Sequence, residues 1–188
     1  MYKVTQEFVD QLRSEGFDVW TISLWENWLK RYGDFCEIKR SIRTAFFDVK
    51  LGSGMGMLEA DGRDRYADDA ELAALRSRDE RDNWKSFSSE TLNQYYCSFG
   101  YLDAKGMLFH LPAYLLCELN DEYDFQFMDF LIGKFATRVD WQSWLDTRQS
   151  ACLWLMFGAL KEHPDFYDQH QEIESAMALL RYQAPDKP

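Results

Sequence analysis

The sequence lacks the short patterns by which many enzymes are recognised. It has no G-K-[ST] phosphate loop, no G-x-S-x-G nucleophile turn and no H-E-x-x-H zinc pattern. Only three histidines occur, His110, His163 and His170, and none has a partner at metal-ligand spacing. We therefore predict no catalytic residues, no metal ligands and no cofactor, although catalytic groups that meet only in the folded chain leave no such pattern.

Cysteine is also scarce, and no long apolar run is present. The four cysteines, Cys36, Cys97, Cys117 and Cys152, are far apart and form no C-x-x-C pair, which favours free thiols and a cytoplasmic location. The first residues contain no basic start followed by an apolar stretch, so we expect no signal peptide. The most apolar segment, 151–160, is too short to span a bilayer, and we expect no membrane partner.

Basic residues are outnumbered, with 21 Lys and Arg against 32 Asp and Glu, a formal net charge of −11. Nucleic acids and anionic membranes are recognised through clusters of positive charge, so neither is an expected partner. A negative surface does speed the capture of a basic protein, but it also serves solubility alone.

Large apolar side chains are abundant, at 46% hydrophobic and 16% aromatic residues. We predict one globular all-α domain over residues 1–188, a bundle of about eight helices with room for one short extended segment at 106–110. The spacing predicts helices at 23–32 and 34–49, separated by Gly33, and the longest helix at 140–161. Pro112 fits the first turn of a helix, and His163 with Pro164 fits the start of the last one.

The longest break in helical periodicity covers residues 51–69. Gly52, Gly54 and Gly56 form G-x-G-x-G, which differs from the G-x-G-x-x-G of dinucleotide sites, so we interpret the segment as a flexible connection.

The densest group of carboxylates follows these glycines. Three interpretations remain open: salt bridges and helix capping, a negative surface that faces a protein partner, and a site for a hard cation or for acid–base chemistry. The predicted partner-binding residues are Asp61, Arg63, Asp64, Tyr66, Asp68, Asp69 and Glu71.

Three short patterns stand between positions 38 and 119: Asp61-Gly62-Arg63-Asp64 with Tyr66, then Asp79-Glu80-Arg81 with Trp84, and Leu111-Pro112-Ala113. In these residues the chain resembles a small bacterial family of unknown function. The family has no established activity, so the resemblance implies no catalytic residue. Small acidic domains of this kind are similar to immunity proteins encoded beside polymorphic toxins.

These observations lead to one expected function and two alternatives. We expect a non-enzymatic, cytoplasmic protein-binding domain, and specifically an immunity protein that neutralises a secreted, basic antibacterial toxin by direct binding. The first alternative is a divalent-metal hydrolase that uses Asp61, Asp64, Asp68 and Asp69. The second is a constitutive scaffold or regulator, whose binding would depend little on ionic strength.

Overall fold

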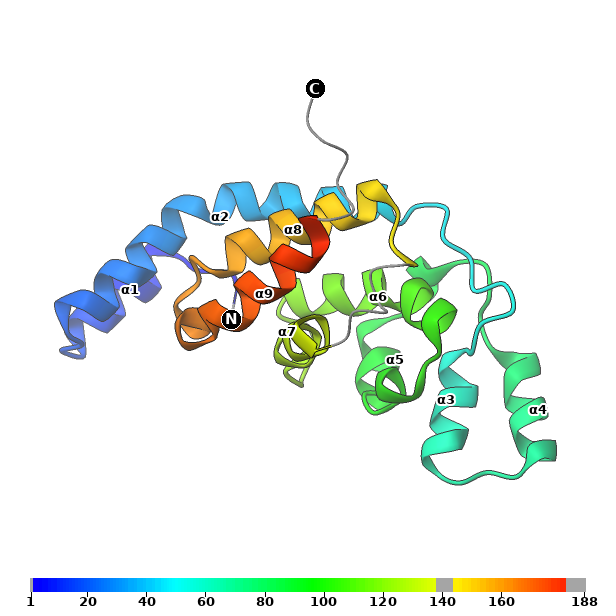
Figure 1. Cartoon of the computed structure of the whole chain (residues 1–188). Coiled ribbons are helices and arrows are strands. Elements are labelled where there is room, and N and C mark those ends of the chain that lie inside the picture. Colours follow the sequence, from blue (N-terminus) through cyan, green and yellow to red (C-terminus); the bar gives the residue numbers. More distant parts are fainter. Residues whose placement is uncertain (1, 138–143, 182–188) are drawn as a thin grey trace. The chain divides into compact units, whose positions relative to one another are not determined.

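The computed structural model describes residues 2–137 and 144–181 (Figure 1). Over these ranges the chain forms nine α-helices and three short 3₁₀ helices and contains no strand, which confirms the all-α class. None of these helices is both long enough and apolar enough to cross a membrane. The fold consists of two compact units: Met1–Ala45 with Asp129–Pro188 (the first unit), and Phe46–Met128 (the second unit).

The first unit is built on one long helix. Its elements are α1 (Gln6–Ser14), α2 (Val19–Ala45), most of α7 (Phe127–Thr137), α8 (Thr147–Leu160), the 3₁₀ helix η4 (Pro164–Gln169) and α9 (His170–Arg181). Helix α8 packs along α2, and α9 packs on α8 (Figure 1). At one end of α2, the Trp28 indole N–H donates to the backbone oxygen of Tyr2 at 2.8 Å, beneath the buried rings of Phe35 and His163.

Helix α2 corrects the prediction of two helices divided at Gly33. A glycine inside a helix costs only about 1 kcal/mol relative to alanine. Trp28, Phe35 and Ile42 are all buried along α2, and their burial exceeds that penalty. Gly33 itself is exposed and would leave an added Cβ in open space, so nothing at this position stops the helix.

The start of α8 also differs from prediction. The helix begins at Thr147 because Asp146 and Gln149 form a reciprocal capping box, with the Asp146 carboxylate accepting from the Gln149 N–H at 2.8 Å. Trp141 lies outside the described residues. The predicted start of the last helical segment is confirmed, since His163 caps η4 and Pro164 occupies its first turn.

The second unit surrounds an apolar helix. Its elements are α3 (Met57–Asp64), α4 (Asp69–Arg78), η1 (Trp84–Ser86), α5 (Ser89–Gln94), η2 (Ser98–Tyr101) and α6 (Ala104–Leu119). Helix α6 replaces the extended segment expected at 106–110, and Pro112 lies inside it rather than in its first turn. The sequence therefore predicted the second half of α6 but not its start, because a helix that is apolar on every side has no amphipathic period.

His110 is fully buried in α6. Its Nδ1–H donates to the Gly106 carbonyl at 2.7 Å, and its Nε2 has no hydrogen-bond partner among the described residues. Burial lowers the pKa of His110 to about 4, because protonation would place an uncompensated charge between Phe87 and Phe109.

Because of His110, we predict that the free energy of unfolding decreases in mild acid. The unfolded chain binds the proton near pH 6.5 and the folded chain only near pH 4, so stability falls as the pH drops through that interval. Between pH 7.5 and 5, wild type should lose roughly 2 kcal/mol more than His110→Phe, which keeps a ring but cannot titrate. Urea denaturation at both pH values measures this difference. Parallel pH profiles would show that His110 does not titrate in this way.

Candidate functional site

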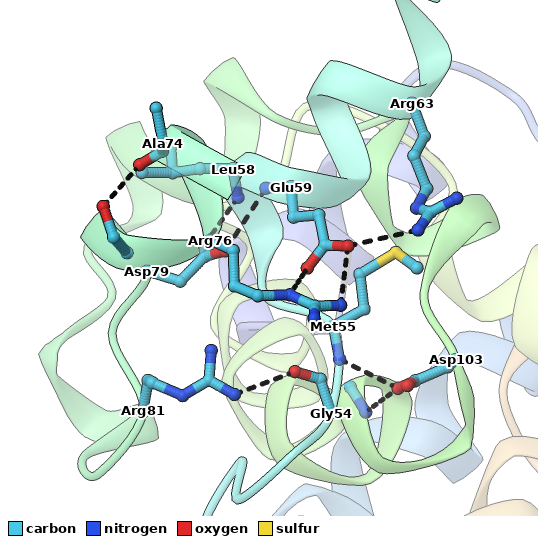
Figure 2. Close-up of polar contacts among 12 residues, drawn as sticks. Gly54, Met55, Leu58, Glu59, Arg63, Ala74, Arg76, Asp79, Arg81 and Asp103 are labelled. Carbon is cyan, nitrogen blue, oxygen red and sulfur yellow. Dashed lines mark hydrogen bonds and ion pairs between the residues drawn. The ribbon is translucent and has the colours of Figure 1, made fainter. Parts of the chain in front are cut away.

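The glycine segment before α3 is held in place by polar contacts from two other parts of the second unit (Figure 2). Arg81 Nη2 donates to the carbonyl oxygens of Gly52 and Gly54, and the Met55 N–H donates to Asp103 Oδ1 at 3.1 Å. A Cβ on Gly56 would lie 2.0 Å from the Asp79 carboxyl carbon. The interpretation as a flexible connection is therefore wrong: glycine is needed here because another chain segment approaches the backbone.

Helix α3 follows directly and corrects the expected loop at 51–69. Its first turn is capped from a distance, because the Asp79 carboxylate accepts from the N–H groups of Leu58 at 2.7 Å and Glu59 at 3.3 Å. Burial of this carboxyl raises the pKa of Asp79. A cap that comes from twenty residues downstream leaves no local sequence signal, which explains the missed helix.

A buried ion pair joins α3 to α4. Glu59 is 2% exposed, and its two oxygens accept from Arg76 Nε at 2.6 Å and Nη2 at 2.9 Å, with Arg63 Nη2 at 3.2 Å (Figure 2). The hydrogen bonds to Glu59 raise the pKa of Arg76. Helix α4 has no buried residue of its own, so this charged contact and the packing of Leu75 against Gly62 hold it in place.

Most of the predicted partner-binding residues serve this helical hairpin. Asp61 pairs with Arg65 at 2.9 Å, Glu71 pairs with Arg65 at 3.5 Å, and Arg63 pairs with Glu59. Asp68 caps α4 by accepting from the Glu71 N–H at 2.9 Å, which was predicted, and Asp69 is exposed in the first turn of that helix. Among the described residues no three His, Cys, Asp or Glu side chains are arranged to hold a metal ion.

Asp64 and Tyr66 differ from the rest because they lie among exposed aromatic side chains. Tyr66 is 95% exposed, and Tyr96, Tyr101 and Phe125 are each at least 40% exposed. We call these four residues with Asp64 the aromatic surface. Sequence reasoning missed Tyr96, Tyr101 and Phe125. Helix α5 ends at Gln94, and the 3₁₀ helix η2 follows at Ser98–Tyr101, so Tyr96 and Tyr101 lie outside α5.

The members of the aromatic surface are close neighbours. The rings of Tyr96 and Phe125 stack with centroids 3.9 Å apart. The Tyr101 hydroxyl donates to the Asp64 carboxylate, which raises the pKa of Tyr101, and Tyr66 adds to this effect. The pKa of Tyr96 is raised mainly by the Cys97 thiol, with a smaller contribution from Asp64. The surface is therefore continuous across three separate chain segments.

Tyr66 occupies a backbone conformation that normally favours glycine. Its φ is 59°, and the bonds from Tyr66 N–H to Arg63 O and from Ala67 N–H to Gly62 O complete a Schellman motif at the end of α3. A left-handed conformation costs a non-glycine residue about 1 to 2 kcal/mol. An almost fully exposed tyrosine recovers little of this by burial, so its presence is not explained by folding stability.

The first unit has a different surface feature, a shallow groove of about 420 Å³ between α2 and α8. Ile38, Trp154 and Leu155 line it together with charged side chains of both signs. It therefore lacks the combination of clustered tyrosines and one dominant charge that marks the aromatic surface.

Residues 34–140 match the model of a family of unknown function (DUF6714). The chain belongs to this family. Comparisons with curated proteins and with solved structures gave no match. The match to DUF6714 includes all of the second unit and confirms the resemblance at the level of a domain of unknown function. The residues that carry the resemblance make structural contacts in this chain. Gly62 leaves room for Leu75, and Arg63 bonds to Glu59. Asp79 caps α3, and Arg81 donates to the carbonyl oxygen of Gly54.

Replacing the strained tyrosine should stabilise this DUF6714 member. We predict that Tyr66→Gly raises the free energy of unfolding by about 1 kcal/mol, because glycine adopts the left-handed conformation without strain. Asp121 has a φ of 60° in the equivalent motif after α6, and Asp121→Gly should give a smaller gain because aspartate tolerates this conformation better. Urea denaturation measures both. A destabilised Tyr66→Gly would show that the ring contributes to the fold.

Proposed function

We propose that this chain is a non-enzymatic protein-binding domain and that the aromatic surface is its contact site. The observation that carries the proposal is the group of four exposed aromatic side chains around Asp64. Tyrosine is enriched among the residues that contribute most to binding energy, because it offers a large contact area with few rotatable bonds. The strain at Tyr66 supports the same conclusion, since stability alone favours glycine there.

The partner that fits this surface is a basic protein. The chain carries a net charge of −11, and the segment from Asp61 to Glu71 holds five carboxylates against two guanidinium groups. A negative surface of this kind accelerates encounter with a positive partner, and the aromatic side chains then slow its dissociation.

In its specific form, the proposal is an immunity protein that occludes a secreted, basic antibacterial toxin in the cytoplasm. The acidic charge and the exposed aromatic surface support it, together with the resemblance described above. Occlusion needs no catalytic group, only a surface that covers the partner's site with sufficient affinity.

The test compares two double variants as affinity baits for basic proteins, including candidate toxin domains. Tyr66→Ser with Tyr101→Ser removes two rings of the aromatic surface. We expect affinity for the partner to fall by about tenfold or more, since each such truncation commonly costs over 1 kcal/mol. Wild-type affinity should also weaken as salt increases. Titration calorimetry of the captured partner at two ionic strengths gives both quantities.

The matched control is Phe17→Ser with Tyr167→Ser, two residues of the first unit that are each 48% exposed. This variant should bind like wild type. Equal affinity of all three proteins for the partner would contradict the proposed contact site. Affinity that does not respond to salt would contradict the electrostatic part and favour a constitutive scaffold.

A further inference from the structure

The carboxylate of Asp64 has unused capacity to bind a cation. It lies at the C-terminal end of α3, which packs against η2, the short helix that ends at Tyr101. An ionised carboxylate has about four acceptor positions. It forms no ion pair with any Lys or Arg of the described residues. The neighbouring guanidinium groups are engaged elsewhere, since Arg63 pairs with Glu59 and Arg65 pairs with Asp61 and Glu71.

The surroundings of Asp64 are aromatic rather than basic. Tyr66 lies two residues after Asp64, in the turn that ends α3, and α3 packs against η2, which carries Tyr101. The influence of Asp64 on the pKa of Tyr101 and of Tyr96 agrees with this proximity. A carboxylate beside several exposed rings is suited to a planar cation, because the ring faces attract positive charge and the carboxylate neutralises it.

We propose that Asp64 and the tyrosines of the aromatic surface bind the guanidinium group of an arginine side chain presented by the protein partner. The inference rests on the proposed function and names the chemistry by which the partner is held. Arginine fits better than lysine because its planar group can stack on a ring while it donates two parallel hydrogen bonds to a carboxylate.

Asp61 provides an internal comparison. It lies one turn before Asp64 on α3, but it already pairs with Arg65 at 2.9 Å. Asp69 is exposed on the same hairpin, at the start of α4, and no aromatic contact involves it in the described part of the chain. A site defined by charge alone would not distinguish Asp69 from Asp64, whereas a site defined by a carboxylate among tyrosines would.

The experiment titrates the full chain with three short peptides, acetyl-Gly-Arg-Gly-amide and its lysine and citrulline analogues, and follows backbone amide signals by NMR. Citrulline keeps the shape of arginine without its charge. We expect saturable shifts with the arginine peptide centred on residues 64–66 and 96–101, weaker shifts with lysine, and none with citrulline. Asp64→Asn should weaken arginine binding about tenfold, whereas Asp69→Asn should change it by less than about twofold.

Equal shifts with citrulline, equal binding of lysine, or an unchanged affinity in Asp64→Asn would each overturn the assignment. Thermal melting of both variants separates lost binding from lost folding. The outcomes also separate this inference from the proposed function. If the serine double variant loses the protein partner but the peptides show no preference for arginine, only the arginine assignment fails. If the serine double variant binds the protein partner as tightly as wild type, the proposed contact site itself is wrong.

Discussion

The carboxylate of Glu59 is the contact on which the aromatic surface depends. It is almost fully buried, and it accepts three hydrogen bonds from two arginines, Arg63 of α3 and Arg76 of α4. Removing Arg76 would take away two of these bonds and leave the buried charge less well compensated. Because α4 buries no residue of its own, its position follows from this contact more than from hydrophobic packing. Tyr66 lies at the turn between α3 and α4, so its position depends on the same contact.

The contacts of Glu59 and its neighbours explain why the segment that matches DUF6714 is rich in charged residues. In the fold, its charged residues cap a helix, hold a loop or pair with Glu59. The aromatic surface lies beside them and consists of side chains that the same hairpin and the 3₁₀ helix η2 leave exposed. The second unit therefore combines charged residues that stabilise its fold with exposed aromatic residues beside them.

The sequence predicted the all-α class and individual helix starts, because apolar periodicity and capping residues such as Asp68 and His163 are local signals. It did not reveal α3, whose cap is Asp79, or the first half of α6, which is apolar on every side. Of the candidate site, Asp64 and Tyr66 were predicted to face a partner, which remains a proposal. Tyr96, Tyr101 and Phe125 could not be added, since they join the surface only through folding of three separate segments.

Amide hydrogen exchange of the chain with and without the proposed basic protein partner tests the central claim most directly. We expect the backbone amides of residues 64–66 and 96–101 and those around Phe125 to exchange more slowly when the partner is bound. Contact with the aromatic surface would shield these amides and suppress local opening. Slower exchange confined to the groove between α2 and α8, with the aromatic surface unchanged, would contradict it.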